Sequence, residues 1–81
     1  MEKEIGKITH IFEKIDVAIL ELADTLKVGD NIHILGSTTD FEQVVDSIQI
    51  EHKNINSAKK GEIVGIKLSD KAKVGDKIFL K

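Results

Sequence analysis

Apolar and polar residues alternate along most of the chain, and this pattern predicts short β-strands. Alternating positions or short apolar runs recur between stretches that contain glycine or several polar residues. The predicted strands are residues 5–12, 17–22, 32–35, 41–52, 61–68 and 78–80. Residues 36–40 and 53–60 are predicted to be polar connections. In the first strand, Ile8, His10 and Phe12 are predicted to share one face, because successive side chains of a strand alternate.

One of these predicted strands has a helical alternative, and another has an irregular pattern. A helix over residues 13–26 is the alternative to the second strand, because four apolar residues recur there at helical spacing. They are Ile15, Ile19, Leu22 and Leu26. β-branched residues in the first half of this segment favour the strand, since they lose side-chain freedom in a helix. In residues 41–52 the alternation is imperfect, which predicts a bulge near Val44 and Val45.

Glycine marks the predicted turns and one strand interior. Lys-Val-Gly-Asp occurs at 27–30 and again at 73–76, each time followed by one polar residue and an isoleucine. The shared pattern predicts a turn in which glycine has a positive φ, although chance recurrence of a common turn stays open. Gly65 interrupts a strand, which indicates a bulge, a bend or a close approach. The residues expected to have structural roles are Gly29, Asp30, Gly61, Gly65, Gly75 and Asp76.

The 81 residues predict one domain spanning 1–81, because six short strands on one small core leave no second core. These strands predict an all-β fold, a closed or nearly closed antiparallel barrel. The chain has no cysteine, no leader-like segment and no apolar run near 18 residues. We therefore do not expect secretion, membrane spanning or a thiolate metal site. A cytoplasmic location is expected instead.

Charge differs between the two halves of the chain. The net charge is −2, and all 12 basic residues are lysines. Residues 1–40 contain four lysines and eight carboxylates, whereas residues 41–81 contain eight lysines and six carboxylates. A surface that faces anions would thus belong to the second half, although a mixed solvated face is the ordinary interpretation of so small an excess.

Catalytic chemistry is not indicated. The chain contains no glycine-rich phosphate loop and no nucleophile motif. His10, His33 and His52 lie on three predicted strands, and a barrel could bring them together as metal ligands. Histidines on the rim or in solvent are the preferred interpretation, because His33 lies between two inward-facing isoleucines. We therefore predict no enzyme activity, no cofactor and no catalytic or metal-binding residue.

The second half resembles a known family. Residues 45–52 are V-D-S-I-Q-I-E-H, and Ile55, Ala58, Gly61, Val64 and Gly65 then follow an apolar-x-x-A-x-x-G-x-x-V-G spacing. Residues 29–36, G-D-N-I-H-I-L-G, precede them. In order and spacing these segments resemble the second domain of translation elongation factors Tu and 1-alpha, over residues 5–80. The resemblance implies a six-stranded antiparallel Greek-key β-barrel.

The resemblance has limits that bear on function. The chain has no room for a GTPase domain, so GTP binding is not implied. The positions that hold the 3′ end of aminoacyl-tRNA in the bacterial factor correspond to Gln49, Glu51, His52 and Ile63, where none of the family's residues is kept. The short connection after Leu68 is more similar to the stand-alone or C-terminal barrels of collagenase-like peptidases and related RNA-modifying enzymes. Those relatives imply an accessory module.

Two functions follow as expectations. The first is a non-catalytic module that contacts RNA, the ribosome or a translation factor, without DNA or membrane as partner. Its predicted RNA-binding residues are Lys53, Lys59, Lys60, Lys67, Lys71 and Lys73. The absence of arginine weakens this function, because arginine provides bidentate phosphate contacts. The alternative is a protein–protein module that docks on a catalytic protein partner, for which an exposed apolar patch around Phe12 or Phe41 would be evidence.

Overall fold

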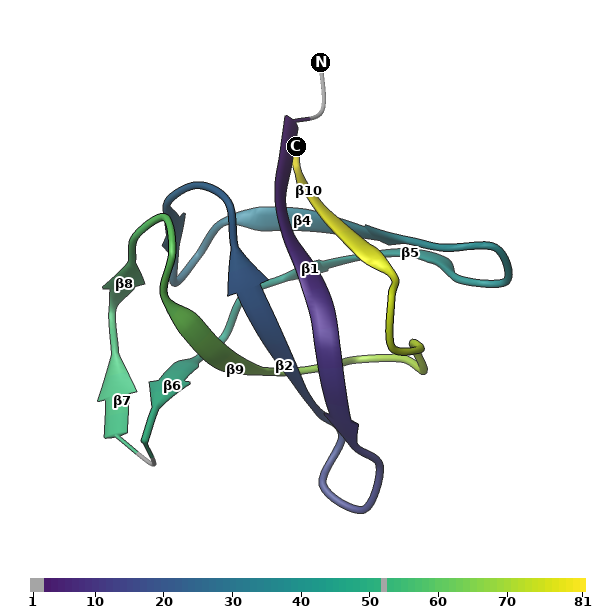
Figure 1. The fold of residues 1–81 in the computed structure, drawn as a ribbon, viewed down its shortest axis with the longest axis horizontal. Coiled ribbons are helices and arrows are strands. Elements are labelled where there is room, and N and C mark those ends of the chain that lie inside the picture. The colour runs from purple at the N-terminus through teal and green to yellow at the C-terminus, as the bar shows by residue number, and fades with distance from the viewer. Residues whose placement is uncertain (1–2, 52) are drawn as a thin grey trace.

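The computed structural model describes residues 3–51 and 53–81, and the regular elements in these ranges are all β-strands (Figure 1). The strands are β1 (Lys3–Phe12), β2 (Val17–Leu22), β3 (Leu26–Lys27), β4 (Asn31–Leu35), β5 (Asp40–Val44), β6 (Ile48–Ile50), β7 (Lys53–Ile55), β8 (Ser57–Ala58), β9 (Ile63–Lys67) and β10 (Lys77–Leu80). The predicted all-β class is confirmed, and the helical alternative for 13–26 is wrong. No helix in the described ranges is long and apolar enough to cross a membrane.

The strands form one large antiparallel sheet and one small one. Eight strands follow the order β5-β4-β10-β1-β2-β9-β6-β7, and β3 pairs with β8 in a separate two-stranded sheet. Within the described residues no ladder joins the two outermost strands, β5 and β7, so the large sheet is not closed. The fold is compact, with a radius of gyration of 11.0 Å. The predicted six-stranded Greek-key barrel is not confirmed.

Two segments differ from their predictions. The single strand predicted over 41–52 is divided into β5 and β6, because the backbone of Val45 is bonded elsewhere. Its N–H donates to the carbonyl of Asp30 at 2.9 Å, and its carbonyl accepts from Gly29 at 2.8 Å. The predicted connection 53–60 contains β7 and β8. His52 lies outside the described residues.

The core is built mainly from isoleucine. Among the residues that the structure describes, fifteen hydrophobic ones are buried, and the largest side chains that are fully buried include Ile5, Ile8, Ile32, Ile34, Ile48, Ile66 and Ile78. β-branched side chains pack well on a pleated surface, which explains why so isoleucine-rich a sequence forms strands. The buried residues form one core cluster, and Phe41 packs against it from β5.

β1 contains two register shifts that change which side chains point outward. The shifts lie between Glu4 and Gly6 in the ladder with β10, and between Ile8 and His10 in the ladder with β2. Ile8 is therefore fully buried, whereas Phe12 is 47% exposed. The prediction that Ile8, His10 and Phe12 share one face is wrong, because an extra residue at the second shift reverses the alternation.

The repeated Lys-Val-Gly-Asp segments form the same turn. In both, the fourth residue donates its N–H to the carbonyl of the first at 3.1 Å, while its carboxylate accepts from the first N–H at 2.8–2.9 Å. The predicted positive φ is confirmed at Gly29 (φ 95°) and Gly75 (φ 96°). Residues 59–62, Lys-Lys-Gly-Glu, form a third copy with Gly61 at φ 88°.

Each of the three turns docks on one buried residue of another segment of the chain. The glycine N–H donates to that residue's carbonyl at 2.8 Å, and the residue's N–H donates to the carbonyl of the turn's acidic residue at 2.9–3.0 Å. The three buried residues are Val45, Leu22 and Ile8, for turns 27–30, 59–62 and 73–76 respectively. The turns therefore tie the edges of the sheet together where regular ladders end.

Gly65 lies within a regular part of β9, paired with Ile19 on one side and Gln49 on the other. The ladder with β2 runs through it without a register shift, so the glycine marks a close approach. A Cβ atom there would lie 3.3 Å from Val17 Cγ1 and 3.4 Å from Ile19 Cδ1. Among the alternatives that the sequence left open, crowding by cross-strand side chains is the one observed.

Gly65→Val is expected to lower the free energy of unfolding by about 1–2 kcal/mol, because two further methyl groups would overpack this site. Thermal melting followed by circular dichroism measures the effect. Lys67→Val is the matched control, since it places the same side chain at an exposed position of β9. A melting temperature equal to that of the unmodified protein would show that the site has room.

Candidate docking surface

Large apolar side chains that remain exposed are the first indication of an interaction surface. They are Phe12, Ile15, Val28, Leu35, Val44, Ile63 and Val74. Single exposed apolar residues are normal on a soluble protein. Phe12 and Ile15 differ because they share one tight turn between β1 and β2, with 47% and 60% of their surface exposed. Phe41, the other predicted patch residue, packs against the core.

The hairpin tip, defined as residues 12–16, holds these two side chains in a fixed relation. Phe12 pairs with Val17 at the end of the ladder, and the Ile15 N–H donates to the Phe12 carbonyl at 3.2 Å. Asp16 has a φ of 54°, which allows the chain to return into β2. The tip projects from the body at the opposite end of β1 from the two termini (Figure 1).

A neighbouring ring orients Phe12. The His10 and Phe12 rings meet edge-to-face, with centroids 4.7 Å apart and an interplanar angle of 71°. This geometry is one that aromatic pairs prefer. It follows from the register shift after Ile8, which turns both rings outward on the same face. The exposed phenylalanine is therefore a partly ordered side chain.

A small groove lies beside the tip. It has a volume of about 90 Å³ and is lined by Ile11, Glu13, Asp16, Leu68, Asp70, Lys71 and Ala72. Its apolar lining comes from β1 and from the segment that follows β9. Its charged lining contains three carboxylates and one ammonium group. We call it the acidic groove. A larger open groove of about 520 Å³ crosses β1 at Gly6, and its charged lining consists of Glu4, Lys7 and Glu21.

The six predicted RNA-binding lysines lie on different parts of the fold. Lys53 begins β7, Lys59 and Lys60 belong to turn 59–62, Lys67 ends β9, and Lys71 and Lys73 precede β10. The turn with Lys59 and Lys60 precedes β9, whereas Lys71 and Lys73 follow it. Figure 1 shows these two segments on different sides of the molecule. The structure thus does not gather all six on one face, and RNA contact stays a prediction.

Lys3 and, more weakly, Lys60 of this set lower the pKa of the Asp24 carboxyl. The Lys3 ammonium group, hydrogen-bonded to Asp24, holds the pKa of that carboxyl below its usual value, and the Thr25 N–H and the charge of Lys60 act in the same direction. A lowered folded-state pKa adds stability above the unfolded-state pKa, and this is lost as pH falls through the folded value. The pair is exposed to solvent, so its contribution is small.

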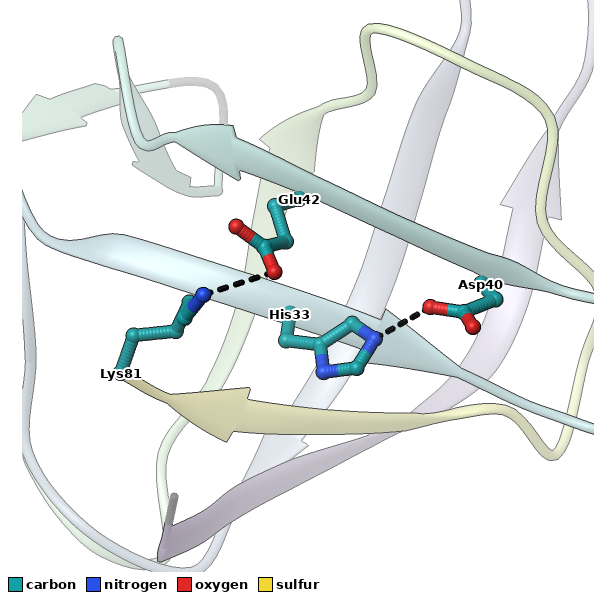
Figure 2. Close-up of polar contacts among 4 residues, drawn as sticks. All are labelled: His33, Asp40, Glu42 and Lys81. Carbon is teal, nitrogen blue, oxygen red and sulfur yellow. Dashed lines mark hydrogen bonds and ion pairs between the residues drawn. The ribbon is translucent and has the colours of Figure 1, made fainter. Parts of the chain in front are cut away.

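The polar residues around His33 form surface contacts on β4 and β5, as Figure 2 shows. His33 Nε2 lies 2.5 Å from Asp40 Oδ1, and Lys81 Nζ lies 2.7 Å from Glu42 Oε2. The first contact links the outermost strand β5 to its neighbour β4, and the second links β5 to the residue that follows β10. His10 lies at the far end of β1, and the described residues contain no group of three or more side chains that could hold a metal ion.

The positions that correspond to the tRNA-end site do not form a polar pocket in the described residues. The Gln49 side-chain amide donates to Asn54 Oδ1 at 3.0 Å, which ties β6 to β7. Ile63 is 59% exposed, and Glu51 has a φ of 49° in the hairpin turn. His52 again lies outside the described residues.

Ile15 and Gln43 were not identified from the sequence. An isoleucine inside the polar segment Glu-Lys-Ile-Asp is itself a signal, because turns favour polar residues and glycine. Gln43 has no such signal. Its side chain donates to the Lys67 carbonyl at 2.8 Å and accepts from the Ser69 N–H at 2.8 Å, joining β5 to the segment after β9. Only the arrangement of the strands places these groups together.

The chain is similar in sequence to short segments of longer known proteins. No family model matches the chain. An uncharacterized protease of Methanocaldococcus jannaschii is 47% identical over 78 residues, which are 95% of this chain and 19% of that protein. A collagenase of Porphyromonas gingivalis is 32% identical over 77 residues, covering 93% of this chain and 21% of the collagenase. The chain thus spans about a fifth of the length of these curated relatives.

Solved structures give the same fold. The C-terminal domain of a Geobacillus thermoleovorans protein described as a U32 peptidase superposes with a TM-score of 0.91 at 17% identity, covering 98% of this chain and 92% of that chain. Its selenomethionine variant gives a TM-score of 0.88 at 18% identity. The likeness to a collagenase-like peptidase domain, which the sequence resemblance implied, is confirmed for the fold. The likeness to elongation factors is not shown by these comparisons.

Proposed function

We propose that this chain is a non-catalytic accessory module that docks on a catalytic protein of the collagenase-like peptidase group. The observation that supports it is the match of 95% of the chain to only 19% of a protease. One small domain therefore corresponds to one part of a much longer catalytic chain. The exposed hairpin tip agrees with this function, since protein docking needs an apolar contact.

The physical basis of the module is a rigid, small scaffold. Its core is a single cluster of buried aliphatic residues, and turns 27–30, 59–62 and 73–76 fasten the sheet where its ladders end. Such a body docks without large rearrangement, so little binding energy is lost to ordering. Catalytic groups are expected from the partner.

The test uses the Methanocaldococcus jannaschii protease from which the matched 78-residue segment has been deleted. The present chain, added as a separate molecule, is expected to bind the truncated protease with a dissociation constant of about 1–100 μM, because interfaces between domains are modest in size. Isothermal titration calorimetry measures it. The intact protease is the matched control and should not bind, since its own segment occupies the site.

Two results would contradict the proposal. One is no binding to a truncated protease whose far-ultraviolet circular dichroism shows that it is folded. The other is equal binding to the truncated and the intact protease. If the truncated protease does not fold, a chimera in which the present chain replaces the native segment tests the same contact. Its melting temperature is expected to match that of the intact protease, and a chimera that aggregates or melts in two separate steps would count against docking.

A further inference from the structure

We infer that the hairpin tip is the docking element of this module, and that it inserts into an apolar pocket of the partner whose rim presents a lysine or arginine to the acidic groove. This inference rests on the proposed function and adds to it the surface and the chemistry of the partner.

The apolar part of the contact follows from the exposure and order of two side chains. Phe12 and Ile15 are 47% and 60% exposed, and neither belongs to the core cluster. The Ile15 N–H bond to the Phe12 carbonyl keeps the two side chains on one turn, and the His10 ring lies edge-to-face against Phe12. Aromatic anchors that are ordered before binding lose little entropy on docking and are frequent hot spots.

The charged part of the contact follows from the acidic groove. Glu13, Asp16 and Asp70 line it together with Lys71, so its lining has an excess of negative charge. Its apolar lining comes from Leu68, which belongs to the core, and from Ile11 and Ala72, which pack against the core. A volume of about 90 Å³ is well below the roughly 300 Å³ of small-molecule sites. A long basic side chain suits this shape, because its alkyl stem covers the apolar lining while its charge stays at the rim.

The same charges argue against other occupants of this surface. Phosphates of RNA and anionic lipid headgroups attract lysine and arginine, whereas the tip presents the carboxylates of Glu13 and Asp16. Together with Lys14, the one lysine of the tip, these two carboxylates give it a net charge of −1. A second copy of this chain in a two-fold contact would bring the same carboxylates face to face. A different protein with a basic rim is the occupant that satisfies both the apolar and the acidic groups.

The test compares three variants in the calorimetric assay with the truncated Methanocaldococcus jannaschii protease. Phe12→Ser with Ile15→Ser is expected to weaken binding at least about tenfold. The matched control is Val28→Ser with Val74→Ser, which removes two apolar side chains of similar exposure from turns 27–30 and 73–76, and is expected to change binding less than about twofold. Asp70→Lys is expected to weaken binding and to reduce its dependence on salt.

A second measurement does not depend on substitutions. Amide chemical shifts of isotope-labelled chain, recorded during addition of the truncated protease, are expected to change at residues 10–17 and 68–72. For the calorimetric comparison, each variant is first shown to keep the melting temperature of the unmodified chain within a few degrees. Shift changes confined to turn 59–62 and β7 would overturn the assignment of the surface.

The possible failures are distinguishable. If the unmodified chain binds and the Phe12, Ile15 variant binds equally, the docking element lies elsewhere and the proposed function stands. If the unmodified chain does not bind the folded truncated protease, both fail. Sedimentation that shows a dimer abolished by the tip variant, or tip-dependent binding to phosphatidylserine vesicles or to a short RNA, would overturn the inferred partner.

Discussion

Gly36→Ala is expected to lower the free energy of unfolding by about 2–4 kcal/mol, because the new methyl group would overlap Oδ1 and Cγ of Asp76. Asp76 cannot easily move away. It is 6% exposed, and its Oδ2 accepts from the Lys73 N–H at 2.8 Å, which closes turn 73–76. Any displacement of the carboxylate therefore also breaks the turn that docks on Ile8. Urea unfolding followed by circular dichroism measures the change.

A double-mutant cycle gives the control for this expectation. In a protein that already contains Asp76→Ala, the carboxylate is gone and Gly36→Ala should cost less than about 1 kcal/mol. The difference between the two costs measures the coupling of the two positions. Equal costs in both backgrounds would show that another neighbour, and not Asp76, excludes a side chain at Gly36.

Asp76→Ala is expected to lower the free energy of unfolding by about 2 kcal/mol, the middle of the range for a buried donor left without its acceptor. The three turns form an internal comparison series, since each acidic residue accepts from the first N–H of its own turn. Asp76 is buried, Asp30 is half-buried and Glu62 is exposed. Water replaces a lost acceptor more easily at an exposed position.

The expected order of destabilisation is therefore Asp76→Ala, then Asp30→Ala, then Glu62→Ala, with the last below about 0.5 kcal/mol. Chemical unfolding of the three variants measures this order. Asp76→Asn is the matched control, because it keeps an acceptor oxygen in the same place and should recover part of the stability. Equal losses at all three positions would mean that burial does not set the strength of this bond.

The docking of turn 73–76 leaves the hairpin tip uncovered, and this bears on the proposed function. Turn 73–76 docks on Ile8, and the β10 ladder with β1 ends at Lys7. Beyond this point β1 stays paired with β2, which is itself paired with β9 as far as Val17, so the turn that joins β1 to β2 projects beyond the paired strands. An accessory module that must contact another protein benefits from such a projection, because the apolar tip can enter a pocket while the core stays intact.

Several features were determined by the sequence itself. The bounds of β2 agree with the predicted strand 17–22, because an uninterrupted apolar segment with β-branched residues fits a buried strand wherever it pairs. The turns at 27–30 and 73–76 were also predictable, since glycine and aspartate at fixed positions satisfy the turn locally. The accessory role followed from a resemblance of motifs, and the comparisons agree with it better than with a translation function.

Other features were decided only by the tertiary structure, because they depend on hydrogen bonds to distant residues. Strand 41–52 divides where turn 27–30 takes the backbone groups of Val45, and the alternation in β1 reverses after Ile8, to which turn 73–76 is bonded. Sequence spacing cannot show which turn will dock on which strand. The outward position of Phe12, and with it the candidate docking surface, follows from that docking. Side-chain alternation is a local property of a strand, but the residue at which the alternation is interrupted is set by the neighbouring segments of the same chain.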